Sequence, residues 1–127
     1  PVNVSKTMTC TKAGTTTDLD QSTGLNRVHL RSTTNKVLLA ANAEGNDLSA
    51  KVYIINKAED PALYVTITIN AQTIGKLYAG DWMFMPWSQT DVAADIEVAA
   101  TSWTASTGDI PVEYALFHED TDFLTNA

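Results

Sequence analysis

A strict two-residue alternation over residues 62–70 constrains the fold of this chain more than any other feature of its sequence. Aliphatic side chains alternate there with polar or aromatic ones, the aliphatic set being Leu63, Val65, Ile67 and Ile69. Successive side chains of a β-strand point to opposite faces of the sheet, whereas a helix repeats about every 3.6 residues. The pattern therefore predicts a strand that buries one face and exposes the other.

Other runs predict further strands. Residues 28–31, 96–100 and 112–116 alternate in the same way, residues 51–56 and 82–87 are apolar on both faces, and residues 2–9 and 37–40 are weaker candidates. Runs that are apolar on both faces are typical of strands covered on both sides. Turn signals such as Thr23-Gly24 and Gly80-Asp81 separate the runs at short intervals. The 18 threonines add support, because a β-branched side chain favours a pleated sheet.

Seven to nine short strands with this punctuation predict an all-β fold, a single antiparallel β-sandwich of jelly-roll-like or immunoglobulin-like type. One domain is also what 127 residues support. Residues 10–24 are polar and rich in threonine, so we expect an N-terminal arm or loop segment over residues 1–24 and the sandwich over residues 25–127. The one helical candidate, residues 91–100, is interpreted as a turn followed by a strand.

The N-terminus and the apolar runs bear on where the chain is made. Residues 1–4 lack the charged stretch and apolar run of a signal peptide, and no apolar run approaches the roughly 18 residues of a membrane span. An N-terminal proline is what remains when an initiator methionine is removed. We therefore expect a complete polypeptide made in the cytoplasm, with no membrane partner.

The acidic excess is unevenly distributed along the chain. There are 15 acidic and 8 basic residues, a formal net charge of −7. Residues 1–57 hold seven bases and four acids, whereas residues 58–127 hold one base and eleven acids. The two halves either form faces of opposite sign, which favours head-to-tail contacts or a basic partner, or interleave so that the asymmetry disappears in space. Nucleic acid is disfavoured as a partner, because the acidic half repels phosphates and no basic stripe is interleaved with aromatics.

No group of residues has the pattern of a catalytic or metal site. Cys10 is the single cysteine, has no neighbouring base and allows neither an intramolecular disulfide nor a Cys-x-x-Cys motif. No Gly-x-Ser-x-Gly motif accompanies the two histidines. Asp95 and Glu97 fit a solvated strand face, and Asp18 and Asp20 lack the other oxygens of a calcium loop. We expect no catalytic residue, no metal and no cofactor.

The aromatic residues are the most informative side chains. Trp82, Phe84 and Trp87 fall on one predicted strand, and Trp103 lies near a predicted hairpin tip beside two hydroxyl residues. Aromatic side chains on a sandwich face can stack on sugar rings. Tryptophan more often packs in a core or an interface, where it buries roughly 150–250 Å². The sequence therefore favours a core or protein interface over a sugar platform.

One stretch is similar to a known class of proteins. Residues 73–98 read TIGKLYAGDWMFMPWSQTDVAADIEV, and residues 111–117 read PVEYALF. The order of an apolar residue, a Gly-Asp turn, an aromatic strand ending in proline and an Asp-Ile-x-Val strand resembles small β-sandwich virion proteins of tailed bacteriophages. The resemblance covers roughly residues 51–118. It implies a virion component of the capsid decoration or cement type rather than an enzyme.

The sequence thus predicts a non-enzymatic virion protein that is made in the host cytoplasm and stabilises a phage head. Its expected partners are the major capsid protein and copies of itself, as a homo-oligomer. The alternatives are a connector or tail protein, or a carbohydrate-binding sandwich that uses exposed tryptophans. The candidate interface residues are Lys6, Lys12, Arg27, Arg31, Trp82, Trp87 and Trp103.

Overall fold

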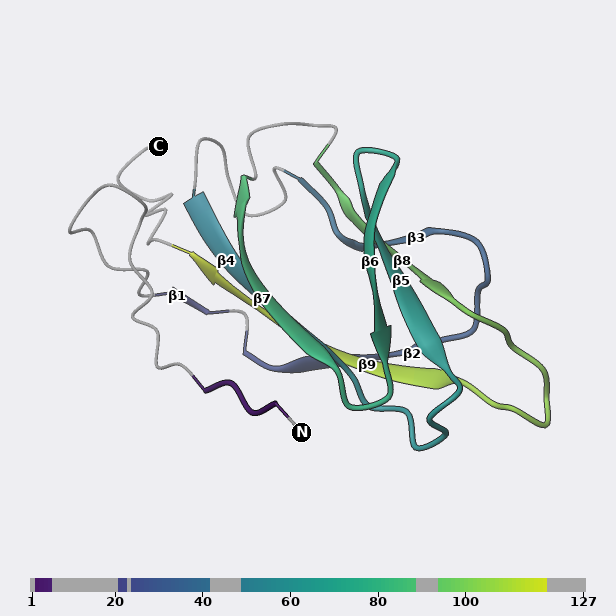
Figure 1. The fold of residues 1–127 in the computed structure, drawn as a ribbon. Coiled ribbons are helices and arrows are strands. Elements are labelled where there is room, and N and C mark those ends of the chain that lie inside the picture. Colours follow the sequence, from purple (N-terminus) through teal and green to yellow (C-terminus); the bar gives the residue numbers. More distant parts are fainter. Residues whose placement is uncertain (1, 6–20, 23, 42–48, 89–93, 119–127) are drawn as a thin grey trace.

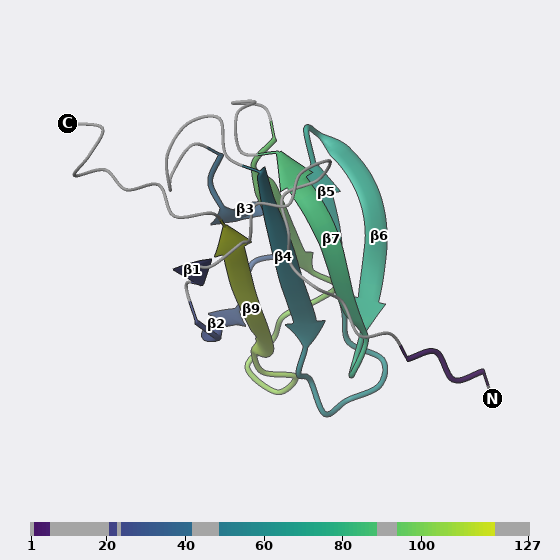
Figure 2. The ribbon, with the colours of Figure 1, turned by 90° about the vertical axis from the view of Figure 1, so that its left-hand side faces the viewer.

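Two antiparallel β-sheets make up the fold. The structure is a computed structural model that describes residues 2–5, 21–22, 24–41, 49–88 and 94–118. Every regular element in these ranges is a strand: β1 (Gln21–Ser22), β2 (Asn26–Leu30), β3 (Lys36–Leu39), β4 (Ser49–Asn56), β5 (Tyr64–Ile69), β6 (Gln72–Tyr78), β7 (Trp82–Ser88), β8 (Ile96–Ala100) and β9 (Ile110–His118). Figures 1 and 2 show the sheets as two layers, which confirms the predicted single-domain antiparallel β-sandwich.

The strand order follows from one long hairpin that is rolled up. β5 pairs with β6, β4 with β7, β3 with β8 and β2 with β9, so that each pair encloses the one before it. Successive pairs belong alternately to one sheet and to the other. The five-stranded sheet has the order β1–β9–β4–β7, and β2 also pairs with β9. The four-stranded sheet has the order β3–β8–β5–β6. Eight strands arranged in this way form a jelly roll. Of the two sandwich types predicted, the topology is therefore the jelly roll.

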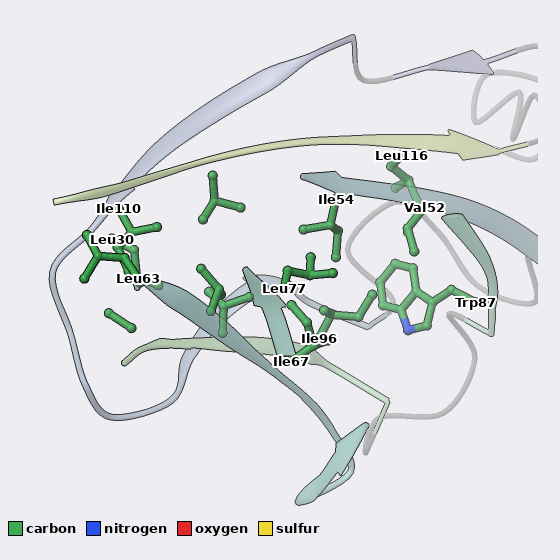
Figure 3. Packing of buried hydrophobic residues seen from close by; sticks show 14 of the residues in the cluster. Leu30, Val52, Ile54, Leu63, Ile67, Leu77, Trp87, Ile96, Ile110 and Leu116 are labelled. Atoms are coloured by element: carbon green, nitrogen blue, oxygen red, sulfur yellow. The ribbon is translucent and has the colours of Figure 1, made fainter. Parts of the chain in front are cut away.

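The core lies between the two sheets and is built from the alternating positions. Figure 3 shows Val52 and Ile54 of β4 facing Ile67 of β5 and Ile96 of β8 across the interior. Each fully buried aliphatic side chain of this kind stabilises the fold by about 1.5–3 kcal/mol. The other members of the buried cluster are Leu30, Ala50, Leu63, Val65, Leu77, Trp87, Val98, Ala100, Ile110, Val112 and Leu116.

The predicted strands are confirmed at 28–31, 37–40, 51–56, 62–70, 82–87, 96–100 and 112–116, with small shifts at their ends. β6 and β1 were not predicted, and β1 lies inside the segment expected to be an arm. Residues 2–5 form no strand. Residues 91–93 of the predicted turn, and the rest of the arm from residue 6 to residue 20, lie outside the described residues.

Two details of the predicted strands were wrong. Among the described residues, the runs 51–56 and 82–87 are covered on one face only, because a two-layer sandwich leaves the outer face of each sheet to solvent and Trp82 is 58% exposed. Trp103 does not lie at a hairpin tip. It lies in the connection from β8 to β9, which crosses from one sheet to the other.

Both edge strands of the β3–β8–β5–β6 sheet carry an irregularity. The register of β3 against β8 shifts between Val37 and Leu39, and the register of β6 against β5 shifts at Ile67 and Thr68. A bulge bends an edge strand and interrupts its row of free backbone groups, which discourages pairing with the edge of another molecule. The edges of this sheet are therefore poorly suited to continuing into a second copy.

The innermost turn of the rolled hairpin joins β5 to β6 through two residues. Ile69 pairs with Gln72, and the intervening Asn70 and Ala71 have φ values of 51° and 59°. Positive φ at both central residues is what a type I′ turn requires, and this twist matches that of the flanking strands. Asparagine tolerates the left-handed region, whereas alanine is strained there.

Replacing Ala71 by glycine should therefore stabilise the protein. We expect A71G to raise the free energy of unfolding by about 0.5–1 kcal/mol. Glycine removes the left-handed backbone strain of the folded state, and this gain is larger than the entropy cost of a more flexible unfolded chain. Denaturant unfolding followed by circular dichroism measures this. The control A62G lies in a loop without positive φ and should leave stability unchanged or lower it; equal effects of the two variants would contradict the explanation.

Asn56 ends β4 and is the most completely buried polar residue described, with 0% of its surface exposed. Its side-chain amide Nδ2 donates hydrogen bonds to the carbonyls of Leu63, at 3.2 Å, and Leu77, at 2.8 Å. Its Oδ1 accepts a hydrogen bond from the amide of Ala58 at 2.8 Å. Leu77 belongs to β6, so this one side chain joins β4 of one sheet to β6 of the other.

The backbone of Asn56 forms hydrogen bonds with the segment that connects β6 of one sheet to β7 of the other. Its amide donates to the carbonyl of Asp81 at 3.0 Å, and its carbonyl accepts from the amide of Gly80 at 2.8 Å. Residues 79–81 carry the chain from β6 to β7. Asn56 thus fixes the β4–β5 connection and the β6–β7 connection at the same end of the sandwich.

Replacing Asn56 by leucine should strongly destabilise the fold. The substitution leaves two buried carbonyls and one amide without their partner, so we expect the free energy of unfolding to fall by about 3 kcal/mol. N56D should lower the free energy of unfolding by at least as much, because it replaces the amide donor with a charged carboxylate oxygen that faces two carbonyls. Thermal and denaturant unfolding measure the change. The exposed control N35L should stay within about 0.5 kcal/mol of the parent, and a similarly small loss in N56L would refute the assignment.

Candidate functional site

The outer face of the β9–β4–β7 part of the larger sheet carries an array of aromatic and apolar side chains. Figure 2 shows these three strands side by side. Ile55 is in register with Trp82, and Tyr53 with Phe84. Lys51 is in register with both Pro86 and Phe117. We call this surface the aromatic face, and it consists of Tyr53, Ile55, Trp82, Phe84, Pro86 and Phe117.

The aromatic rings of this face form two tilted pairs. Tyr53 and Trp82 have ring centroids 6.2 Å apart at an interplanar angle of 43°, and Phe84 and Phe117 have centroids 6.2 Å apart at 39°. The rings therefore do not form one flat surface. Trp82 and Pro86 are exposed, while Tyr53, Phe84 and Phe117 are half-buried, so that the face is both apolar and uneven.

Trp87 lies on the opposite side of β7 from Trp82 and Phe84. Only 6% of its surface is exposed, and its Nε1 donates a hydrogen bond to the carbonyl of Ala94 at 2.7 Å. Figure 3 shows the indole among the aliphatic side chains of the core. Trp87 therefore does not belong to an outer surface, although the sequence placed it among the candidate interface residues.

Trp103 and Arg31 converge on Asp109. The indole Nε1 of Trp103 donates to Asp109 Oδ1 at 2.8 Å, and Nε of Arg31 lies 3.0 Å from the same oxygen. The Arg31 guanidinium also lies 5.7 Å from the centre of the Trp103 ring, within the range of a cation–π interaction. The hydrogen bond from Trp103 and then the Arg31 guanidinium hold the pKa of Asp109 below its ordinary value of 3.8. The three residues tie the β8–β9 connection to the end of β2.

Arg27 is also paired within the chain. Its guanidinium donates to Glu113 Oε2 at 2.6 and 3.0 Å, between neighbouring strands β2 and β9. Arg27 and Arg31 belong to the basic half of the sequence, and Glu113 and Asp109 belong to the acidic half. At β2 and β9 the two halves therefore interleave, which is the second of the two arrangements considered for the uneven charge. Lys6 and Lys12 lie outside the described residues.

Two hollows lie near β2. A cavity of about 550 Å³ at one end of the sandwich has a lining that includes Lys57, Glu59 and Asp60 from the β4–β5 connection, with Arg27 and Asp109. Three acids and two bases line it, so the cavity has no strong charge of one sign that would select a ligand. A groove of about 380 Å³ lies between β2 and β3, with Val28, Leu30, Val37, Leu38, Val98 and Tyr114 as apolar lining and His29, Arg31, Ser32 and Lys36 as polar lining. We call it the edge groove.

The groups considered for catalysis and metal binding are spread over the described structure. Asp95 Oδ1 accepts a hydrogen bond from the amide of Ala41 at 2.6 Å, which gives it a structural role before β8. No group of three or more His, Cys, Asp or Glu in the described ranges is placed to hold a metal ion. No described helix is long and apolar enough to cross a membrane. The chain matches no protein-family model and no curated protein sequence.

The sequence identified only part of the aromatic face. Trp82 and Phe84 were recognised from their strand, but Tyr53, Ile55 and Phe117 were not linked to them. The period of two places each residue on one side of its own strand. It does not say which strands are neighbours, so the face became visible only with the β9–β4–β7 order.

Removing the Asp109 carboxylate should release Trp103. In a W82F background Trp103 is the one exposed tryptophan, at 38%, because Trp87 is buried. We expect acrylamide quenching of its fluorescence to rise in D109A, and to rise less in D109N, which keeps an acceptor for the indole. D60A, which breaks a hydrogen bond in a different loop, is the control and should not change the quenching.

The same carboxylate has a defined pH dependence. The folded pKa of Asp109 is lowered, so its contribution to stability is present above the ordinary value of 3.8 and is lost as the pH falls through the folded value. The difference in stability between the parent and D109N should therefore narrow on acidification. A constant difference between pH 6 and pH 2 would contradict this account.

Proposed function

We propose that this chain is a non-enzymatic structural protein of a tailed-phage virion, of the capsid decoration or cement type, that binds and stabilises the phage head. The observation that carries the proposal is the aromatic face on the outside of a rigid jelly roll. Its partners would be the major capsid protein and further copies of the chain, and its location would be the assembled virion.

The chemistry of the aromatic face supports contact with another protein. Tryptophan and tyrosine are enriched among the residues that carry most of the binding energy of interfaces, and such residues cluster in a central patch. Trp82 and Tyr53 are in contact and lie beside Phe84 and Ile55 on paired strands. Because these side chains project from strands rather than loops, little conformational entropy is lost when a partner covers them.

The topology supports a virion component by analogy. Jelly rolls of eight strands recur in viral capsid proteins, and they also occur in lectins and cupins. The same fold serves unrelated functions, so the analogy has less weight than the surface itself. The resemblance of residues 73–98 to small phage sandwich proteins points in the same direction, because this stretch contains β7 and most of β6 and β8.

The carbohydrate alternative requires stacked, accessible tryptophans, and the three indoles lie on three different parts of the molecule. Trp82 is on the aromatic face, Trp87 is in the core, and Trp103 packs beside Arg31 at the opposite edge of the sheet. The rings that do cluster around Trp82 are tilted by about 40° rather than coplanar. These positions favour a protein interface over a sugar platform.

Stabilisation of a head would come from many weak contacts acting together. A copy bound across two capsid subunits makes its second contact at a high effective concentration, so avidity exceeds the affinity of either contact. A rigid sandwich transmits this restraint between subunits. The connector or tail alternative uses the same surface chemistry and differs only in the partner.

The test is binding to empty heads of the phage that encodes the chain. We expect the protein to co-sediment with heads and to raise the melting temperature of the heads. The double variant W82A/F84A should bind at least tenfold more weakly, because each substitution removes about 1–3 kcal/mol of binding free energy at an interface centre. Y78A is the matched control, since Tyr78 is an exposed aromatic residue of the other sheet. Absence of co-sedimentation by the parent, or full binding by the double variant, would overturn the proposal.

A further inference from the structure

The edge groove combines an apolar floor with a basic rim. Val28 and Leu30 of β2 and Val37 and Leu38 of β3 all line it, and none of the described residues that line it is acidic. In a chain with a net charge of −7 this is an unusual composition. Lys36 has no ion-pair partner in the described part of the chain, whereas Arg31 is already paired with Asp109.

The bulge in β3 helps to form the groove. Neighbouring residues of a regular strand point to opposite faces, yet Val37 and Leu38 both line this hollow. They do so because the register of β3 shifts between Val37 and Leu39. Val37 remains 54% exposed, so the floor of the groove offers apolar surface that nothing in the described chain covers.

The end of the sequence has the complementary composition. Residues 119–127 read EDTDFLTNA, with three acids, no base, and the apolar pair Phe123-Leu124. An extended segment of this kind can place apolar side chains on the floor of the groove while its carboxylates approach the rim. Charge complementarity of this sort selects partners and register.

The length of this segment decides which copy supplies it. Val28 and Leu30 are in register with Val112 and Ile110 of β9, six and eight residues before His118, which places them about 20–26 Å from the end of β9. Phe123 and Leu124 follow His118 by five and six residues and reach about 18 and 21 Å when fully extended. A reversal of the chain after β9 consumes part of that length. The tail of the same chain therefore falls short of the β2 side of the groove.

We propose that the edge groove binds the C-terminal segment, residues 119–127, of a second copy of this chain. The inference does not depend on binding to a capsid. It gives the chain a contact of its own, formed by a tail and a groove rather than by continuation of a sheet edge, and it uses surface separate from the aromatic face.

A labelled peptide EDTDFLTNA tests the groove directly. We expect saturable binding to the full chain by fluorescence anisotropy, at least tenfold weaker binding to K36E and to V37S, and weaker binding at high salt. I74S is the matched control, because Ile74 is an exposed aliphatic residue on the other bulged edge strand. No binding by the parent, or equal binding by V37S and I74S, would overturn the proposal.

Mixing experiments with full-length chains test the second copy. Sedimentation velocity should show self-association of the parent that is weakened at least tenfold by K36E, and by a tail variant carrying E119K, D120K and D122K. Mixing the two variants should restore association, because the reversed charges again attract. A parent that stays monomeric at all concentrations, including one whose groove is filled by its own tail, would overturn the assignment to a second copy.

Discussion

The hydrogen bonds of Asn56 are the constraint on which the rolled arrangement depends. Hydrophobic burial alone would accept several ways of stacking two apolar sheets, since it is not directional. Asn56 is directional: its side chain reaches Leu63 and Leu77, and its backbone reaches Gly80 and Asp81. It thereby fixes both connections at one end of the sandwich. Trp82 follows immediately after the second connection, so the position of the aromatic face beside β4 follows from the same contacts.

Much of the fold could be predicted because the buried faces of the central strands repeat with a period of two. β4, β5, β8 and β9 have partners on both sides, and their inward positions are Val, Ile or Leu at most steps. β6 was missed because it is an edge strand whose side chains are exposed except Leu77, and its bulge breaks the period. β1 has only two residues and exists through its pairing with β9. The structural importance of Asn56 was also not predicted, although an asparagine at an inward position of an apolar strand was the available signal.

The candidate site was predicted less well than the fold, for a geometric reason. Because side chains alternate between the two faces of a strand, Trp82 and Phe84 point to one side of β7 and Trp87 to the other. Strict use of this alternation would have placed Trp87 in the core. Cross-strand neighbours are a property of the topology, so Tyr53 and Phe117 could not be joined to Trp82 from the sequence. The uneven charge had the same weakness. Arg27 and Glu113 are 86 residues apart in sequence, yet their side chains lie 2.6 Å apart. This contact joins a base of the first half of the chain to an acid of the second half, so the two halves do not form separate charged faces there.

The proposed assembly requires apolar surface that does not cause aggregation, and the placement of the two proposed surfaces meets this requirement. Open sheet edges accept any strand, because backbone hydrogen bonds carry no sequence information. Here the two edges of the β3–β8–β5–β6 sheet are bulged, while the aromatic face lies on the outside of the other sheet and the edge groove lies between β2 and β3. A partner of either surface would be selected by side-chain shape and charge. The two surfaces share only β9, where Phe117 belongs to the aromatic face and Tyr114 lines the edge groove. If both proposals hold, one copy would contact two different neighbours through them.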